Sequence, residues 1–317
     1  MRFLMTETPR FAVAALAAGA AGVFVSENLF WSAPRPGFSP GDWVLAWIAY
    51  ALAAAVGLAA VAVTGCGGWR GLFLGGALFG FVTEGVLVDT MYDAFPVQLV
   101  WTPLAWHALL SALAAGGIAR SAAARGAGRQ AAAWIALGLM FGGFALYWPA
   151  EWGGRLPAGP EVLAYLAGYG LALPVAHAVL DRIGTVPRPP GYVLLAAPLM
   201  AAGIWAVKTV LAPDPVRLAM PVMAALTFWA MVRLGDRAAP VSLGAAAPAW
   251  KHALALLMPL TAAAVAITLW PLTGGLPANL VMLAISAPAG LGLWLWLLWR
   301  AYRARAESAA DRSIAPS

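Results

Sequence analysis

The sequence predicts an all-helical protein that crosses a membrane many times, and three observations carry this prediction. The 317 residues are 62% apolar and 10% charged, with a mean hydropathy of +0.81, which lies outside the range of soluble domains. Apolar runs of about 20 residues, the length that a helix needs to cross a hydrocarbon core, recur along the chain. They lack the alternation of apolar and polar residues that membrane β-strands require.

Short segments with Pro, Gly and Arg separate ten such runs. We predict ten membrane-spanning helices at about 11–30, 43–63, 69–89, 98–118, 131–149, 162–181, 192–212, 217–234, 252–270 and 279–299. The polar segment 304–317, which follows the last run, is predicted to be a disordered cytoplasmic tail.

The basic residues predict how the chain is oriented. With a cytoplasmic N-terminus, all but four of the 19 Lys and Arg fall on the inside, and the exceptions are Arg35, Arg155, Lys208 and Arg217. The positive-inside rule therefore predicts both termini in the cytoplasm. We expect a multi-pass protein of the cell inner membrane, and this asymmetry explains most of the net charge of +6 without a nucleic-acid partner.

Similar segments recur along the chain and predict internal repeats. WPAEWGGRLPA from Trp148 resembles WPLTGGLPA from Trp270, and weaker matches pair Glu27 with Glu151 and Glu84 with Lys208. We predict parallel four-helix repeats in a 4+4+2 arrangement, because an even number of spans keeps all copies in one orientation. The predicted units are 1–120, 121–237 and the terminal helix pair 238–303.

Small residues predict where helices pack closely. Gly71/Gly75, Gly76/Gly80 and Gly138/Gly142 have the small-xxx-small spacing that lets helix backbones approach each other in lipid. The lone cysteine, Cys66, lies in TGCGGWRG, which we interpret as a tight turn between the second and third spans.

Glu84 is the most unusual acid of the chain. Five residues before the predicted helix end at Asp89, it lies roughly 8 Å below the outer boundary. Ionisable side chains at such depth face a bundle interior, a partner or a water-filled cavity. We therefore place Glu84 in the functional site.

His107 is the second unusual group, near the middle of the fourth predicted helix. An imidazole titrates near physiological pH, so His107 is a candidate for acid–base or proton-relay work, with an interhelical hydrogen bond as the alternative. Pro103 removes a backbone donor one turn earlier and can open the helix.

Lys208 is the repeat counterpart of Glu84, which suggests that the two form an ion pair. The remaining candidates for solute binding are Glu27, Glu151, Trp101 and Tyr92. Asp89 and Asp93 follow Glu84 on the acidic outer face and join Glu84 and His107 as catalytic candidates if the chain is an enzyme.

His177, Asp181 and His252 lie at the predicted inner ends of their helices, away from His107. Because no three histidines share a face, we predict neither a metal nor a cofactor. Hydrolase and nucleotide motifs are also absent, and among the serines only Ser26, beside Glu27, has a distinctive setting.

Three functions stay open at this point. The first is a transporter for a small solute or ion through a polar site that opens to the outer face and uses Glu84, His107 and Lys208. The second is a membrane-embedded enzyme that acts on a lipid or isoprenoid by acid–base or cyclase-type chemistry, for which Glu27 is a further candidate. The third is a structural subunit of a membrane complex. The expected partners are the lipid bilayer and a small solute or lipid, and the oligomeric state is left open.

Overall fold

The computed structural model describes residues 6–35, 37–244 and 247–314, with side chains as far as Ala304. Within these ranges the regular elements are helices, and an isolated β-bridge joins Thr185 and Ser242. Ten helical stretches of the described chain are long and apolar enough to cross a membrane. The predicted class and number of spans are thereby confirmed.

Several spans consist of two or more consecutive helices, some of them π-helical or 3₁₀. In chain order the elements are α1 (Glu7–Val23), η1 (Phe24–Asn28), α2 (Leu29–Trp31), α3 (Pro40–Thr64), α4 (Gly68–Val82), η2 (Thr83–Leu87), η3 (Thr90–Tyr92), α5 (Gln98–Val100), η4 (Trp101–Ala119), η5 (Ala122–Arg125), α6 (Ala127–Ala145), α7 (Trp148–Glu151), α8 (Gly159–Gly170), α9 (Ala172–Ile183), α10 (Gly191–Leu211), η6 (Pro215–Leu218), α11 (Ala219–Leu234), α12 (Ala249–His252), η7 (Ala253–Leu256), α13 (Leu257–Thr273) and α14 (Ala278–Ile314).

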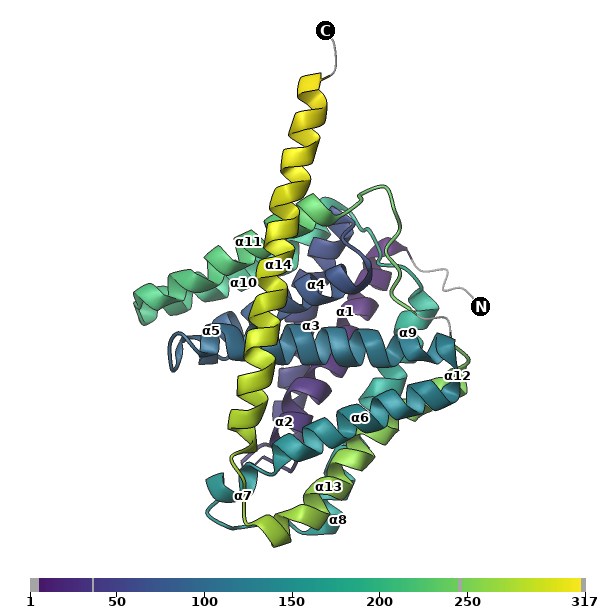
Figure 1. Cartoon of the computed structure of the whole chain (residues 1–317), viewed down its shortest axis with the longest axis vertical. Coiled ribbons are helices and arrows are strands. Elements are labelled where there is room, and N and C mark those ends of the chain that lie inside the picture. The colour runs from purple at the N-terminus through teal and green to yellow at the C-terminus, as the bar shows by residue number, and fades with distance from the viewer. Residues whose placement is uncertain (1–5, 36, 245–246, 315–317) are drawn as a thin grey trace.

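Helix η4 lies at the centre of the packing (Figure 1). It packs against α4, which in turn contacts α3, while α1 lies between α3 and α9. Helices α6 and α13 run side by side, and the long α14 crosses η4 and contacts α11 (Figure 1). This arrangement brings the first span, the third span and η4 together, which positions the site.

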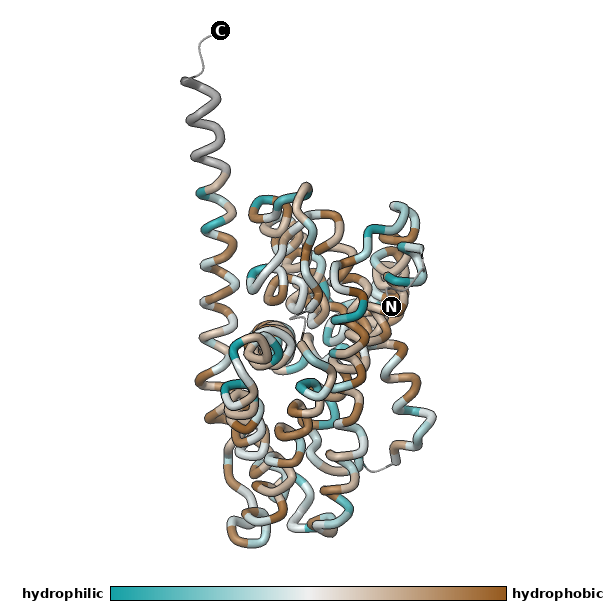
Figure 2. Tube along the Cα trace, turned by 90° about the vertical axis from the view of Figure 1, so that its right-hand side faces the viewer, coloured by the Kyte–Doolittle hydropathy of each residue, from teal (hydrophilic) through white to brown (hydrophobic). Residues whose placement is uncertain are grey.

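Apolar residues recur along the helices (Figure 2), and many large ones are exposed. Helix α10 is the clearest case, because Ala201 is its one buried residue and Val210 and Leu211 are each 79% exposed. Such a surface would be costly in water and is suited to hydrocarbon. The exposed apolar faces are therefore those expected of a protein embedded in lipid.

Helix α3 shows how the sequence sets its own helix ends. The Ser39 backbone N–H donates to Asp42 Oδ2 at 2.8 Å and the Asp42 N–H donates to Ser39 Oγ at 3.3 Å, which forms a capping box with Pro40 in the first turn. At the other end Gly65 has φ +69°, a left-handed conformation that favours glycine. The predicted tight turn at TGCGG is confirmed.

Two of the three glycine pairs predicted for close packing lie where two helices touch tightly, whereas a Cβ on Gly71 would meet the Cys66 carbonyl of the preceding turn and one on Gly75 would make ordinary contact with Val61 at 3.4 Å. A Cβ on Gly76 would lie 2.5 Å from the Ala112 Cβ, and one on Gly80 would lie 2.7 Å from the Pro103 Cα. Both contacts join α4 to η4. On α6, a Cβ on Gly138 or Gly142 would meet α13 at 2.6 or 2.7 Å. The absent side chains thus allow two of the main helix contacts.

Connections predicted on the same side of the membrane contact one another. At the end of the helices that holds Cys66, here called the Cys66 end, Arg188 donates to the carbonyls of Arg237 and Ala239 at 2.8 Å. At the opposite end, here called the Asp89 end, the Leu276 N–H donates to the Leu146 carbonyl at 2.8 Å.

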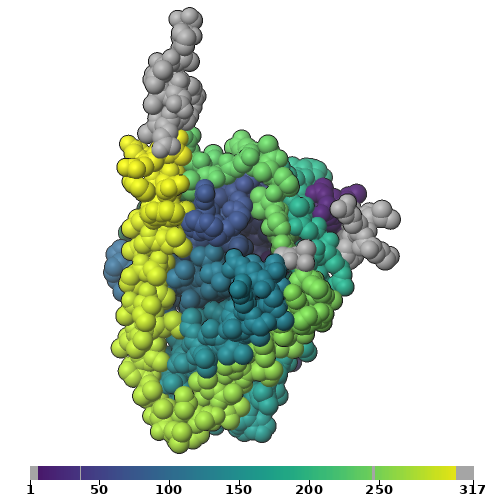
Figure 3. All heavy atoms as spheres, turned by 45° about the vertical axis from the view of Figure 1, so that its right-hand side comes forward, coloured from purple at the N-terminus to yellow at the C-terminus, as the bar shows by residue number. Residues whose placement is uncertain are grey.

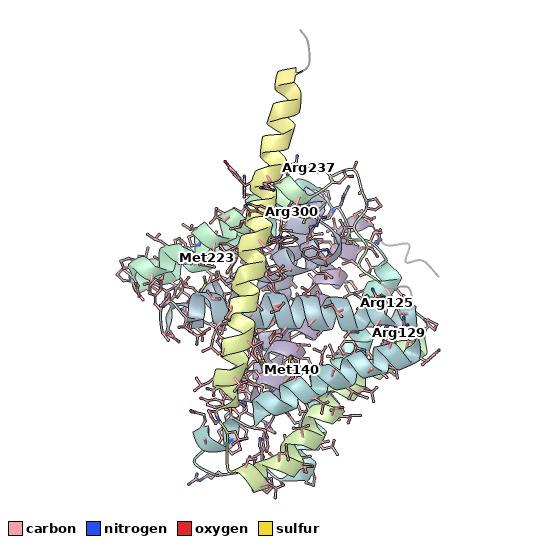
Figure 4. The ribbon with its side chains drawn as sticks, in the orientation of Figure 1. Arg125, Arg129, Met140, Met223, Arg237 and Arg300 are labelled. Carbon is pink, nitrogen blue, oxygen red and sulfur yellow. The ribbon has the colours of Figure 1, made fainter. Side chains whose placement is uncertain are left out.

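The basic side chains follow the same division. Figure 4 shows Arg125 and Arg129 at one edge of the molecule and Arg237 and Arg300 at another. All four belong to the predicted inner segments. Which end faces the cytoplasm stays a prediction, as do the repeats and the unit boundaries.

The predicted tail is helical as far as Ile314 and continues α14. Residues 315–317 lie outside the described residues.

Candidate functional site

Three stretches of the described chain are π-helical, and each carries a polar residue of one cluster. Ser26 and Glu27 lie in η1, Glu84 lies in η2, and His107 and Ser111 lie in η4. π-Turns are rare and recur at functional sites, because the extra residue per turn changes the direction of the side chains. The cluster therefore forms where three helices depart from α geometry.

Glu84, His107, Ser26 and Ser111 form a continuous series of hydrogen bonds, here called the Glu84 cluster. Glu84 Oε1 lies 2.6 Å from His107 Nε2, His107 Nδ1 lies 2.9 Å from Ser26 Oγ, and Ser26 Oγ lies 3.0 Å from Ser111 Oγ. All four side chains are buried. The prediction that Glu84 is buried deep in its helix is confirmed, and His107 is its partner.

Both ends of this series have further contacts. The Thr90 hydroxyl donates to the second oxygen of Glu84, and the Ser111 hydroxyl bonds to the Trp106 carbonyl at 2.9 Å. The Trp106 indole N–H donates to the Ser26 carbonyl at 3.1 Å. The imidazole, the indole and the serine hydroxyls are all held by hydrogen bonds. The cluster is therefore fixed in one arrangement.

Glu27 lies beside the cluster without joining it directly. The Tyr50 hydroxyl donates to Glu27 Oε1 at 2.6 Å, and the Tyr50 ring centroid is 6.1 Å from that of His107. Glu27 is therefore a neighbouring acid with a partner of its own.

The expected ion pair between Glu84 and Lys208 is wrong. Lys208 Nζ donates to the Leu87 carbonyl at 2.9 Å and lies 3.1 Å from Asp89 Oδ2. The Lys208 side chain is satisfied before it can reach Glu84. Because η2 ends at Leu87, the Lys208 ammonium meets the free carbonyl at this helix end and the Asp89 carboxylate first. Glu84 is thus paired with a residue of η4, and Lys208 is paired with a residue of the loop that follows η2.

Asp89 is the centre of a second charged group at this end, here called the Asp89 latch, made of Asp89, Lys208 and Arg217. Arg217 Nη2 lies 3.2 Å from Asp89 Oδ2, and the guanidinium lies 4.7 Å from the Tyr92 ring centroid. Partial burial would raise the pKa of Asp89, but its bonds to Arg217 and Lys208 outweigh burial and hold that pKa below its usual value. Burial raises the pKa of Tyr92 to about 12, so both groups keep one charge state near neutral pH.

Three other candidates lie outside both groups. Asp93 and Glu151 are exposed, and Trp101 is buried against Trp106 with ring centroids 5.8 Å apart. Tyr92 covers the cluster from the Asp89 end, where its hydroxyl donates to the Gly85 carbonyl at 2.6 Å.

A further polar group lies at the Cys66 end, here called the Asp181 cluster, with Arg120, Asp181, His177 and His252. Arg120 pairs with Asp181, whose other oxygen lies 3.3 Å from His252 Nε2. His177 stacks on Trp134 at 5.8 Å, with its ring centroid 6.4 Å from that of His252. In the described ranges no group of three or more His, Cys, Asp and Glu is placed to hold a metal ion.

One cavity of about 350 Å³ connects the Glu84 cluster with the Asp181 cluster. Its wall includes His107 and Ser111 at one end and Arg120 and His177 at the other, with mainly Gly, Ala, Leu and Val between them. A recess between α4 and the segment that follows α11 is visible in Figure 3. Gly68, Gly71, Gly75 and Gly76 of α4 belong to this wall.

The cavity reaches the Cys66 end of the helices, and which face of the membrane the polar site opens to stays a prediction. It runs from His107 to the connections at that end, where Gly67 and Ser242 line it. At the Asp89 end Thr90 and Tyr92 cover Glu84. The η3 turn folds back over η2 to form this cover, and hydropathy carries no signal for such a turn.

Sequence reasoning missed Ser111, Tyr50, Arg120 and Arg217 as site residues and gave Ser26 no role. A signal existed for Ser26 and Ser111, since each is a hydroxyl within an apolar span. Arg120 and Arg217 looked like ordinary basic residues at helix ends, and no local pattern distinguishes them.

Comparison with protein-family models, with curated proteins and with solved structures found no match for this chain. Its function has to be argued from its own residues.

Proposed function

We propose that the chain is a membrane carrier that moves a small solute together with a proton. The observation that carries this proposal is the hydrogen-bonded series Thr90, Glu84, His107, Ser26 and Ser111. It extends from the loop at the Asp89 end to the wall of a cavity that reaches the Cys66 end.

The chemistry of the series suits proton transfer. Ser111 lines the cavity and can accept a proton from that side while its own hydroxyl proton turns from the Trp106 carbonyl to Ser26. Ser26 then accepts that proton and releases its own to His107 Nδ1, and the imidazole releases the proton on Nε2 to Glu84, so that each group keeps its number of protons except Glu84, which gains one. An imidazole has two nitrogens and titrates near physiological pH, so it can accept on one side and release on the other. Ionisable groups inside a membrane commonly serve as such relays.

The two charged groups support a carrier in a second way. The Asp89 latch ties α10 and η6 to the end of η2, and the Asp181 cluster ties η4 to α9 and α12. A carrier has to open its central site to each side in turn. These ion pairs lie at opposite ends of the Glu84 cluster, where opening would have to occur.

The test compares cells that lack the protein with cells that make the wild type, Glu84→Gln or Asp93→Asn. Metabolites and lipids of cells and medium are profiled with and without a protonophore. We expect a solute whose accumulation needs the wild type and a proton gradient. Glu84→Gln should reduce that accumulation to the level of cells without the protein, because an amide cannot carry the proton.

Asp93→Asn is the matched control, since Asp93 is an exposed acid of the same segment. If Glu84→Gln matches the wild type in every profile at equal protein level, the proton relay is wrong. If the lipids change and no solute does, the carrier is wrong and the enzyme is favoured.

A second function is favoured by one specific observation, the order Ser26, His107, Glu84. A hydroxyl 2.9 Å from an imidazole that is itself held by a carboxylate at 2.6 Å is the arrangement of an activated serine nucleophile. The cavity beside it could accept an acyl chain. A covalent acyl group on Ser26 would identify this enzyme and exclude a pure carrier.

A further inference from the structure

We propose that the cavity binds a small organic anion with an apolar body, and that Arg120 binds its negative group. The proposal rests on the proposed function, because it names the class of solute for the cavity that the Glu84 cluster borders.

Charge is the first argument. Among the described residues that line the cavity, Arg120 is the one charged side chain, and none is Asp or Glu. Glu84 lies behind His107, and Asp181 lies behind Arg120. A ligand in this space therefore meets a cation and no carboxylate, which favours an anion.

The state of Arg120 is the second argument. Its Nη atoms donate to the Leu243 and His177 carbonyls and to Asp181, while its Nε is buried with no partner among the described residues. Asp181 is shared, because its other oxygen faces His252 and the Ala247 N–H, at 3.3 and 3.4 Å. The guanidinium thus keeps an unmet donor, and its counter-charge is divided with a second group.

The shape of the cavity is the third argument. The wall is mainly Gly, Ala, Leu and Val, and beside Arg120 and the two histidines its polar side chains are few, chiefly the hydroxyls of Ser111, Ser121 and Ser242. At about 350 Å³ the space lies at the lower end of ligand pockets. A short monocarboxylate fits these constraints, with its chain directed toward His107.

The charges also fit the proton relay. A monoanion on Arg120 and a proton on the Glu84 cluster add no net charge when they move together. The two ends of one cavity would thus bind the two components of an electroneutral cargo.

The experiment measures ligand binding to the purified full-length protein in detergent at one neutral pH, without a proton gradient. The probes are hexanoate, hexanol, hexylamine and sulfate, and the readouts are the thermal unfolding midpoint and calorimetric titration. We expect hexanoate alone to raise the midpoint. If hexanol binds as tightly as hexanoate, Arg120 does not bind a negative group. If sulfate binds as tightly as hexanoate, the ligand needs no apolar body.

Arg120→Lys keeps the charge but loses the planar fork, so the affinity for hexanoate should fall about tenfold. Arg125→Lys is the matched control, because Arg125 is exposed at the same end and should bind like the wild type. Unchanged affinity of Arg120→Lys would contradict the proposal. The unliganded midpoint of each variant shows whether it is folded, and His177→Gln, which lines the same end, should also weaken hexanoate binding if Arg120→Lys fails to fold.

Glu84→Gln separates this inference from the proposed function. It should bind hexanoate as the wild type does and yet fail to accumulate solute in cells. In the wild type, hexanoate binding without proton-dependent accumulation would refute the carrier and leave the anion site standing. Accumulation without hexanoate binding would refute the anion site alone.

Discussion

Glu84 Oε1 and His107 Nε2 lie 2.6 Å apart at a buried position between helices, where few other groups can form a hydrogen bond with either side chain. A buried carboxylate or imidazole without a partner would cost several kcal/mol, so this pair also holds η2 against η4. Stability and the proposed function therefore depend on the same bond. Ser26 and Ser111 differ, because a serine in a helix can satisfy its own hydroxyl through a backbone carbonyl.

Ser26 offers the residue-scale prediction. Ser26→Ala should lower proton-dependent accumulation at least tenfold, because it interrupts the series between His107 and Ser111.

A fluorophosphonate probe should leave the wild type unlabelled, since Ser26 is 3% exposed and its hydroxyl is engaged with both His107 and Ser111.

Ser286→Ala is the control for Ser26→Ala. Ser286 is a buried serine whose hydroxyl donates at 2.7 Å to the Met282 carbonyl of its own helix. Labelling of the wild type and of Ser286→Ala but not of Ser26→Ala would refute the proposed carrier and support the serine enzyme.

At the scale of elements, the contact between α4 and η4 decides whether the site exists. Glu84 follows directly from α4 through η2, and His107 belongs to η4. The two helices approach closely because Gly76 and Gly80 lack side chains at the contact. A change in their separation would move the two groups of the relay apart.

Gly80→Val tests this contact. Its Cβ would lie within 2.7 Å of Pro103 and 3.0 Å of the His107 Cβ, so η4 must shift. Overpacking of this kind costs about 1–3 kcal/mol. We expect a lower thermal midpoint and no solute accumulation.

Gly203→Val on α10 is the matched variant, because no atom lies within 4 Å of its Cβ position. It should unfold and transport like the wild type. Equal midpoints for both variants would show that the α4–η4 contact is not tight.

At the scale of the molecule, polar groups divide between the two ends of the helices. The Asp89 latch lies at one end and the Asp181 cluster at the other, with the Glu84 cluster and the cavity between them. Most basic residues belong to the Cys66 end, so the cavity reaches the end that the positive-inside rule assigns to the cytoplasm.

Thiol labelling tests that orientation. Asp93→Cys and Arg125→Cys place single new thiols on exposed positions at opposite ends. In intact cells, a membrane-impermeant maleimide should label Asp93→Cys, whereas Arg125→Cys should need permeabilised cells. The reverse pattern would invert the predicted topology.

The native cysteine provides the background for this measurement. Cys66 is buried, and burial raises the pKa of its thiol to about 11. The thiolate is the reactive form, so wild-type labelling should be negligible at neutral pH and rise only as the pH approaches that value.

The sequence by itself determined the class, the ten spans, the Gly turn at Cys66 and the two most unusual side chains, Glu84 and His107. These follow from local properties, because hydropathy, turn chemistry and the cost of a charge in lipid can be read from a short stretch of chain.

Only the tertiary structure decided which partners those side chains have. It paired Glu84 with His107 and Lys208 with Asp89, gave Ser26 and Ser111 a place in the series, and put Arg120 on the cavity wall. These pairings join different spans or a span and a loop, and three of the helices involved are π-helical, which changes the direction of their side chains. The facing side of a helix is set by such packing, which no local pattern specifies.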